Sequence, residues 1–205
     1  MGFLQTRRAR SVRLKVRGLV LAGGKSSRFG EDKASVFYKG KRFIEHAADL
    51  LESIGLKPVV VTRQGADYPF LRCPVLRDKL PEKGPLGGIY TAMSVFKNIS
   101  FLVLTCDMPA LHSSALLKLL THQSTQHAIV FSYNSALQPF PGIYSSSLFV
   151  PIGRRIIKGN LSMTGLLEET DDKTVLSWRS DGSIFLNINR KEDIFPTAAP
   201  VESNS

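Results

Sequence analysis

The stretch Val16-Arg17-Gly18-Leu19-Val20-Leu21-Ala22-Gly23-Gly24 determines the fold class that we predict for this chain of 205 residues. Its apolar residues form a short run that stops at two adjacent glycines, which is typical of a buried strand followed by a turn. Similar apolar runs at 58–61, 100–104 and 128–131 alternate with segments of helical periodicity. We therefore predict an α/β fold, a single domain in which helices cover both faces of a mostly parallel sheet.

Periodicity and helix-ending residues give the expected bounds of the remaining elements. We expect helices at 42–54, 86–96, 113–120, 148–157 and 163–168, a late strand at 184–188, and a short helix near 191–194. In parallel sheets, ligands bind beyond the carboxyl ends of the strands. The loops that follow the strands are therefore where we look for functional residues.

Composition indicates a soluble globular protein, with 43% hydrophobic and 21% charged residues. No apolar run reaches the roughly 18 to 20 residues that a bilayer-crossing helix needs, so no membrane contact is expected. Cys73 and Cys106 form neither a CxxC pair nor a metal-ligand spacing. Two such cysteines favour a reducing, cytoplasmic location.

The positive charge is concentrated at the amino terminus. Residues 1–17 contain six basic residues and no acid, and subtracting these six from the net charge of +10 leaves +4 for the rest. We expect a disordered basic arm at 1–15, one domain at 16–195 and a frayed tail at 196–205. A nucleic-acid-binding or membrane-surface arm is the alternative interpretation.

The loop after the first strand, Leu21 to Lys33, has the composition of a phosphate-binding turn. Paired glycines let backbone N–H groups approach an anion, Arg28 offers a planar fork for phosphate, and Lys33 adds a point charge. The loop is not a dinucleotide fingerprint, because it lacks GxGxxG. It is not a P-loop either, because Leu19 stands where that motif requires glycine.

Two later loops carry further candidate residues. Asp107 follows the strand at 100–104, and a carboxylate at the end of a strand beside a phosphate pocket is a natural Mg²⁺ ligand. A turn or cap role for this aspartate stays open. The loop from Asp78 to Gly88 contains Gly84 and Pro85, which predict the start of a helix. A simple loop is an equally good interpretation from the residues alone.

The run Leu21 to Lys33 fits the pattern LAGGxSxRxGxDK, which resembles the signature of the molybdenum cofactor guanylyltransferases, the MobA-type nucleotidyltransferases. The resemblance covers about residues 16–195. It implies a Rossmann-like, three-layer α/β/α fold of the nucleotide-diphospho-sugar-transferase type. It also implies that the loop, including Gly24, holds a triphosphate, that the Leu21-Ala22-Gly23 backbone helps to place the guanine, and that Arg28 and Lys33 stabilise phosphate charge.

The same resemblance extends to the other loops. Gly84-Pro85-Leu86-Gly87-Gly88 is similar to the family's GPLAG segment, which contacts the base, and Asp78 matches an aspartate beside the nucleotide. Thr105-Cys106-Asp107-Met108-Pro109 is similar to the family's Cys-Asp-x-Pro motif, which assigns the metal to Asp107. Thr62 stands where the family often has a nucleotide-binding asparagine.

Two weaker matches concern the acceptor. Gln138-Pro139 with Gly142-Ile143-Tyr144 resembles a proline-bearing strand that lines the acceptor pocket, and Asn187 with Asn189 resembles a late Asn-x-Asn near the metal. Alternation along a strand would place Asn187 and Asn189 on one face. Two turn-forming asparagines are the alternative. Cys106 is expected to be a small buried residue rather than a nucleophile.

The resemblance implies an Mg²⁺-dependent enzyme that transfers GMP from GTP to the phosphate of molybdopterin and releases pyrophosphate. Other cofactor-biosynthesis proteins and recipient molybdoenzymes are the implied protein partners, and nucleic acid is not an expected one. Two alternatives remain: a related nucleotidyltransferase that uses CTP or a sugar-1-phosphate acceptor, and a non-catalytic nucleotide-binding protein.

Overall fold

A computed structural model describes residues 15–23, 32–122 and 126–188. Several predicted features lie outside these ranges. They are the basic arm up to residue 14, Gly24 and Arg28 of the first loop, Asn189, the short helix expected at 191–194, and the tail at 196–205.

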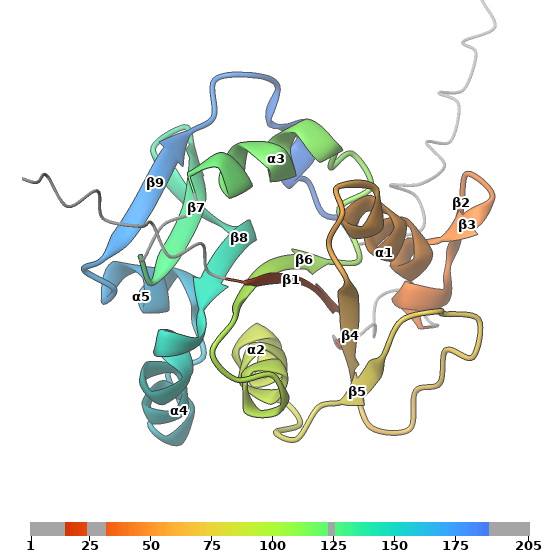
Figure 1. The fold of residues 1–205 in the computed structure, drawn as a ribbon, viewed down its shortest axis with the longest axis horizontal. Helices are drawn as coiled ribbons and strands as arrows, with labels where there is room; N and C mark the ends of the chain where they lie inside the picture. The colour runs from red at the N-terminus through yellow and green to blue at the C-terminus, as the bar shows by residue number, and fades with distance from the viewer. Residues whose placement is uncertain (1–14, 24–31, 123–125, 189–205) are drawn as a thin grey trace, which may run out of the picture.

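The described residues form a seven-stranded sheet in the order β5-β4-β1-β6-β8-β7-β9 (Figure 1). The strands are β1 (Val16–Leu21), β4 (Pro58–Thr62), β5 (Val75–Arg77), β6 (Ser100–Thr105), β7 (Ala128–Tyr133), β8 (Ala136–Ser145) and β9 (Lys173–Ser177). β8 pairs antiparallel with β6 and β7, and the other pairings are parallel. A short hairpin of β2 (Phe37–Tyr38) and β3 (Lys41–Arg42) lies outside this sheet. The predicted mostly parallel sheet is confirmed.

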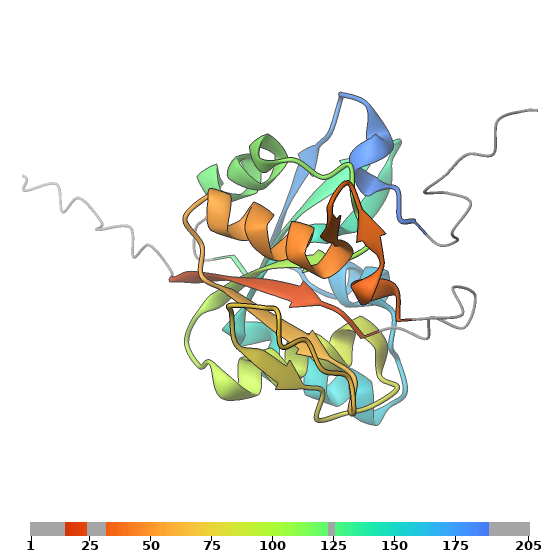
Figure 2. The same cartoon turned by 90° about the vertical axis from the view of Figure 1, so that its right-hand side faces the viewer.

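Helices cover both faces of the sheet, as Figure 2 shows from the side. α1 (Phe43–Ser53) and α3 (Ser113–Thr121) lie on one face, and α2 (Gly84–Val95), α4 (Phe149–Ile157) and α5 (Met163–Glu168) lie on the other. Three 3-10 turns are η1 (Lys33–Ser35), η2 (Ser146–Leu148) and η3 (Gly182–Phe185). The predicted three-layer α/β/α arrangement is therefore confirmed. None of the helices in the described ranges has the length and apolar character needed to cross a bilayer.

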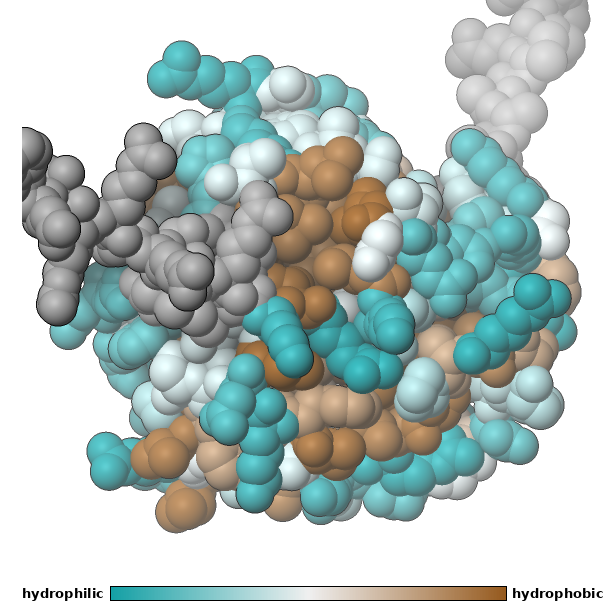
Figure 3. All heavy atoms as spheres, viewed as in Figure 1, coloured by the Kyte–Doolittle hydropathy of each residue, from teal (hydrophilic) through white to brown (hydrophobic). Residues whose placement is uncertain are grey.

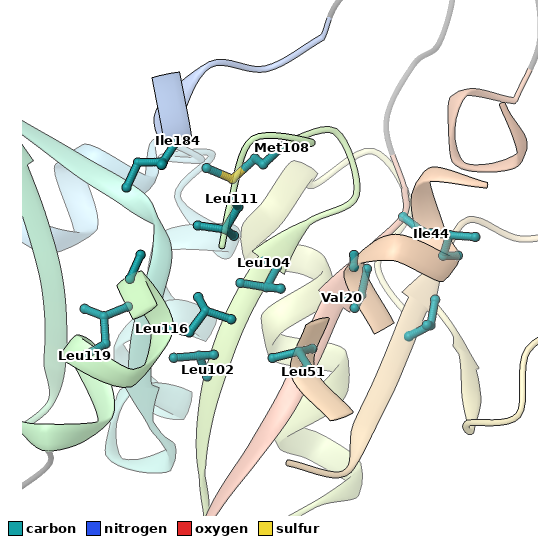
Figure 4. Close-up of a cluster of buried hydrophobic side chains, with 14 of the residues drawn as sticks. Val20, Ile44, Leu51, Leu102, Leu104, Met108, Leu111, Leu116, Leu119 and Ile184 are labelled. Atoms are coloured by element: carbon teal, nitrogen blue, oxygen red, sulfur yellow. The ribbon is translucent and has the colours of Figure 1, made fainter. Parts of the chain in front are cut away.

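Strand alternation divides the core into two layers. Val20 of β1 packs with α1 residues such as Ile44 and Leu51, in the cluster drawn in Figure 4. Leu19 and Leu21 point to the opposite face, where they join the cluster that includes α2. Because successive side chains of a strand point to opposite faces, a run without polar residues is buried on both sides.

Close packing fixes α2 against β1. A Cβ added at Gly88 would lie 2.7 Å from Leu21 Cδ2, so a larger residue here would require the Leu21 side chain to move. The amino end of α2 is thereby held beside the carboxyl end of β1. Pro85 lies in the first turn of α2, as predicted, where its missing N–H costs no hydrogen bond.

The late strand predicted at 184–188 is wrong. The segment begins as the 3-10 turn η3, whose N-cap Asp181 accepts a hydrogen bond from the Ser183 N–H at 3.1 Å. Residues 186–188 follow outside any strand. Strands β5 and β9 were not predicted from the residues, and β8 was expected only through the family resemblance.

Candidate nucleotide and metal site

The carboxyl ends of β1, β4, β5 and β6 meet at one edge of the sheet, because these strands are parallel. Backbone hydrogen bonds extend the sheet slightly past this edge. The Ala22 N–H donates to Val61 O at 2.9 Å, and the Asp78 N–H donates to Thr62 O at 2.7 Å. On the other side of β1, the Cys106 N–H donates to Leu21 O at 3.3 Å. The sheet therefore brings the predicted loops together at one place.

Lys33 and Asp107 form the central pair of this site. The Lys33 ammonium donates a hydrogen bond of 2.8 Å to Asp107 Oδ2. The two side chains are 14% and 19% exposed, so both charges are largely withdrawn from water. Lys33 begins η1, and Asp32 caps that turn by accepting the Ala34 N–H at 3.3 Å. The Lys33 cation, predicted from the first loop, thus forms an ion pair with the Asp107 carboxylate, predicted from the third.

The second carboxylate oxygen of Asp107 fits a metal ligand. Asp107 Oδ1 is buried and has no hydrogen-bond partner among the described residues. A buried oxygen of this kind is costly unless something coordinates it. The described ranges contain no cluster of three His, Cys, Asp or Glu side chains able to hold a metal. Asp107 is the kind of donor that Mg²⁺ uses, because this ion is usually held by one or two carboxylates together with substrate phosphates.

The first loop leaves the sheet at Gly23. Leu21 and Ala22 are buried, whereas Gly23 is exposed. A Cβ at Gly23 would lie 3.4 Å from the Arg63 backbone N, so this glycine runs close to the end of β4. The Leu21 and Ala22 side chains are therefore buried, and the Leu21 O and the Ala22 N–H are used within the sheet, so Gly23 is the described residue of this loop whose backbone is exposed. Gly24 and Arg28 lie outside the described residues.

Thr62 is placed differently from our expectation. Its side chain is fully buried, and its hydroxyl donates to the Tyr68 hydroxyl at 3.4 Å. In this arrangement the hydroxyl faces the protein interior and not a ligand at the edge of the sheet. The exposed residues at this end of β4 are Arg63 and Gln64. A nucleotide contact through the Thr62 side chain stays a prediction without geometric support.

Asp78 lies in the predicted place but is already engaged by the protein. Its Oδ1 accepts hydrogen bonds from the Leu80 N–H at 3.0 Å and from the Thr91 hydroxyl at 2.9 Å. Thr91 belongs to α2 and is buried, so Asp78 joins the loop after β5 to that helix. Gln64 Nε2 adds a bond of 2.7 Å to Asp78 O. Asp78 therefore shapes this loop, whatever it contacts in a ligand.

The start of α2 faces the same edge. Gly84 has φ +59°, a left-handed conformation that suits glycine, and a Cβ there would meet no atom within 4 Å. Leu86 is fully buried, so only its backbone is available to a base. The glycine-proline turn thus exposes main chain rather than side chains at the predicted base-binding segment.

The carboxy-terminal segment reaches the site without forming a strand. The Ile188 N–H donates to Asp107 O at 2.9 Å, which brings exposed Asn187 near the metal candidate. The expectation that Asn187 and Asn189 share a strand face fails, because residues 186–188 are not a strand. Asn189 itself lies beyond the described residues.

The acceptor segment on β8 is only partly at this edge. β8 runs antiparallel to β6, with Gly142 opposite Val103, so Gln138 and Pro139 lie toward the carboxyl end of β6. Residues 142–144 are buried within the sheet. The Tyr144 hydroxyl donates to Pro139 O at 2.6 Å, which fixes the strand internally. Of this predicted group, Gln138 and Pro139 are the residues that lie toward the edge of the sheet that carries Asp107.

Apolar residues surround the Asp107 turn on its other side. A cleft of about 320 Å³ is lined by α1, the end of β6 and the segment after it, including Cys106 and Met108. Seen as in Figure 1, apolar surface lies between α1 and α3 (Figure 3).

Burial raises the pKa of the Cys106 thiol to about 12, and the Asp107 carboxylate adds to this effect. The thiol therefore stays protonated near neutral pH, which agrees with the expected inert role.

Three contacts at the site were not anticipated. Tyr68 donates to Asp32, Gln64 donates to the Asp78 backbone, and Thr91 donates to the Asp78 carboxylate. None belongs to a recognisable motif, and each joins segments separated by at least 13 residues in sequence. Asp32 stood in the quoted loop pattern, but its residue type alone did not indicate a partner.

Comparisons with known proteins agree with this geometry. The model of the MobA-like NTP transferase domain family matches residues 18–174. A "probable molybdenum cofactor guanylyltransferase" of Aquifex aeolicus is 32% identical over 175 residues, covering 85% of this chain and 86% of that protein. A protein of the same description from Pyrococcus horikoshii is 34% identical over 195 residues, covering 88% and 98%.

Solved structures give the same result for the fold. Molybdopterin-guanine dinucleotide biosynthesis protein A of Archaeoglobus fulgidus has a TM-score of 0.72 at 22% identity, covering 87% of this chain and 94% of that one. A crystal structure from Aquifex aeolicus has a TM-score of 0.71 at 30% identity, covering 88% and 95%. The family resemblance predicted from the sequence is confirmed. The chain therefore belongs to the MobA-like NTP transferase domain family, a family of nucleotidyltransferases.

Proposed function

We propose that this nucleotidyltransferase transfers GMP from GTP to the phosphate of molybdopterin, with or without molybdenum, and releases pyrophosphate. The observation that carries the proposal is the Lys33–Asp107 pair at the carboxyl edge of the sheet, with Asp107 Oδ1 buried and without a partner among the described residues. The names of the relatives from Aquifex aeolicus and Pyrococcus horikoshii support the choice of substrates.

The chemistry is a displacement at phosphorus. An oxygen of the acceptor phosphate forms a bond to the α-phosphorus of GTP, the bond from that phosphorus to the bridging oxygen breaks, and pyrophosphate leaves with the electron pair. The acceptor phosphate is already an anion, so no strong general base is needed. The protein contributes positioning and charge stabilisation.

Each segment has a role in this reaction. Asp107 would hold Mg²⁺, which supplies charge neutralisation at the phosphates when bound. Lys33 and Arg28 stabilise the negative charge that grows on the leaving pyrophosphate, and the exposed backbone at Gly23 lies beside the triphosphate. The main chain of Gly84, Pro85 and Leu86 meets the base.

The acceptor enters from the side of β8 and the carboxy-terminal segment. Gln138 and Pro139 lie toward the carboxyl end of β6, and Ile188 bonds to the Asp107 backbone. Asn187, and Asn189 beyond the described residues, complete this side in our proposal. We place the reaction in the cytoplasm, where the two free cysteines persist as thiols. Other cofactor-biosynthesis proteins and recipient molybdoenzymes are the proposed protein partners.

A pyrophosphate-release assay with Mg²⁺ and molybdopterin tests the substrate, with GTP, CTP, ATP and UTP compared at equal concentration. We expect release with GTP to exceed release with each other nucleotide at least tenfold. A preference for CTP would instead assign the chain to cytidylyl transfer. Tight nucleotide binding without pyrophosphate release from any of the four nucleotides would favour a non-catalytic nucleotide-binding protein.

A further inference from the structure

The buried Tyr68 makes a hydrogen bond to the loop that carries Lys33. Its hydroxyl donates to Asp32 Oδ2 at 2.7 Å, across 36 residues of sequence. The tyrosine is 2% exposed and follows β4 by six residues, and its ring lies against that of Phe70 at 5.9 Å. The bond therefore joins the loop that follows β4 to the loop that follows β1.

The acceptor of this bond organises the start of η1. The Asp32 carboxylate also accepts the Ala34 N–H at 3.3 Å and the Ser35 hydroxyl at 3.4 Å. The next residue is Lys33, whose ammonium lies 2.8 Å from Asp107 Oδ2. The carboxylate that accepts the Tyr68 hydrogen bond therefore belongs to the residue directly before Lys33, which is the cation of the proposed site.

The tyrosine is held from its other side as well. The Thr62 hydroxyl donates to the Tyr68 hydroxyl at 3.4 Å, and Thr62 is fully buried at the end of β4. Hydrogen bonds from Thr62 to Tyr68 and from Tyr68 to Asp32 therefore connect the end of β4 to the start of η1. This contact gives the Thr62 hydroxyl a structural use that does not require a nucleotide.

We propose that Tyr68 is a positioning residue for nucleotidyl transfer: its hydroxyl holds Asp32 and thereby fixes Lys33 at Asp107. This inference rests on the proposed function. A buried tyrosine needs a hydrogen-bond partner in any fold, and Tyr144 finds one in the backbone carbonyl of Pro139. Tyr68 instead bonds the carboxylate that caps the turn carrying Lys33, which is the arrangement expected of a support for the site.

Tyr68→Phe removes the hydroxyl and keeps the buried ring, so the fold is expected to persist. Loss of one hydrogen bond that orders a catalytic cation is expected to lower kcat about tenfold, with little change in the KM for GTP. Tyr90→Phe is the control, because Tyr90 is only half-buried and stacks on Phe149 at 4.5 Å, on the other helix layer. It should leave both constants unchanged.

A double-mutant cycle separates positioning from simple stabilisation. If Tyr68 acts through Asp32, Tyr68→Phe adds no further loss of kcat in an Asp32→Ala background. If the tyrosine affects turnover by a route that does not pass through Asp32, the two losses multiply. Multiplied losses would overturn the proposal.

Hydrogen exchange tests the same link without turnover. The Ser35 N–H bonds to Asp32 O at 2.9 Å and the Val36 N–H bonds to Lys33 O at 3.2 Å. Tyr68→Phe should speed exchange at both amides about tenfold. The Val60 N–H, which bonds to Pro74 O at 2.9 Å, should keep its rate.

Different results refute the proposed function and the role of Tyr68. A wild-type protein that transfers nothing from GTP refutes the proposed reaction, and the exchange rates then decide whether Tyr68 holds the Lys33 segment. Unchanged exchange at Ser35 and Val36, or unchanged kcat in an active enzyme, overturns the role of Tyr68.

Discussion

Lys33 and Asp107 are 74 residues apart in sequence, yet their side chains form a direct ion pair of 2.8 Å at the carboxyl edge of the sheet. The pair joins the loop after β1 to the end of β6, and it uses one carboxylate oxygen of Asp107 while the other stays without a partner among the described residues. This division of one carboxylate between a fixed cation and a metal position underlies the proposed chemistry.

Lys33→Ala should lower both stability and turnover. Asp107 would lose a charged donor while remaining mostly buried, and hydrogen bonds to charged groups contribute about 1.5–3 kcal/mol. Urea unfolding should report a loss in this range, and kcat should fall roughly 100-fold because a charge-stabilising group is missing. Lys41→Ala is the matched control, since Lys41 pairs with Asp49 at the exposed surface and should change little. A Lys33→Ala enzyme with normal kcat would contradict the assigned role.

Thr91→Val tests how the base-side loop is held. The Thr91 hydroxyl bonds to Asp78 Oδ1 at 2.9 Å and accepts the Lys79 N–H at 3.0 Å. Valine has the same shape but removes the acceptor of the Lys79 N–H and one of two donors to Asp78 Oδ1, and a hydrogen bond typically contributes about 0.5–1.5 kcal/mol. We expect this loss in urea unfolding and a several-fold weaker nucleotide Kd by calorimetry. Thr121→Val, at an exposed hydroxyl of α3, is the control and should change neither the free energy of unfolding nor the nucleotide Kd. Equal effects of the two variants would refute the explanation.

Gly88→Ala should separate α2 from β1. The added Cβ would lie 2.7 Å from Leu21 Cδ2, so the buried Leu21 side chain must move, and we expect a loss near the lower end of the about 1–3 kcal/mol that overpacking costs. Thermal unfolding should show the loss. Gly153→Ala is the comparison, because its Cβ would lie 3.2 Å from Tyr90 Cε2, and the better helix propensity of alanine offsets this milder contact. A Gly88→Ala protein as stable as wild type would show that the helix moves without cost.

Alkaline pH should destabilise the protein through its buried tyrosines. Burial raises the pKa values of Tyr68 and Tyr144 above the ordinary value of 10.0. Above that pH the unfolded chain releases phenol protons that the folded chain retains, so stability is full below pH 10 and falls as pH rises. The slope is about 1.4 kcal/mol per pH unit for each group.

Tyr144→Phe isolates one of these groups. Urea unfolding at several pH values from 8 to 11 should give a variant that is less stable at pH 8, because the bond to Pro139 O is lost. Above pH 10 the free energy of unfolding of the variant should fall less steeply than that of wild type, and the two slopes should differ by about 1.4 kcal/mol per pH unit. Identical slopes would contradict the assigned burial effect.

The sequence predicted the central architecture because its signals were local. The β1, β4 and β6 strands each contain a run of three or four apolar residues, and α1 and α5 follow helical periodicity closely. β5 has only three residues, which is too short for a pattern, and polar residues interrupt β9. Pro139 and Pro141 lie inside β8, where proline argues against a strand.

The site was predictable only in part. Loop composition and the family resemblance named Lys33 and Asp107 separately, and the parallel sheet explains why they meet. The contacts of Tyr68 depend on tertiary packing between residues 36 apart, and no spacing rule reveals them. For the same reason the burial of Thr62 was not foreseen, because a hydroxyl at a strand end faces a ligand or the core with equal ease.

Asp107→Asn provides the most direct test of the central claim, that this carboxylate holds the metal for nucleotidyl transfer. The variant keeps the side-chain shape but loses the charge, and Asp49→Asn serves as control because Asp49 also pairs with a lysine. Product formation from GTP and molybdopterin is followed by mass spectrometry in saturating Mg²⁺. We expect at least a 100-fold loss of guanine dinucleotide for Asp107→Asn and none for Asp49→Asn. A near-wild-type rate for Asp107→Asn would contradict the claim.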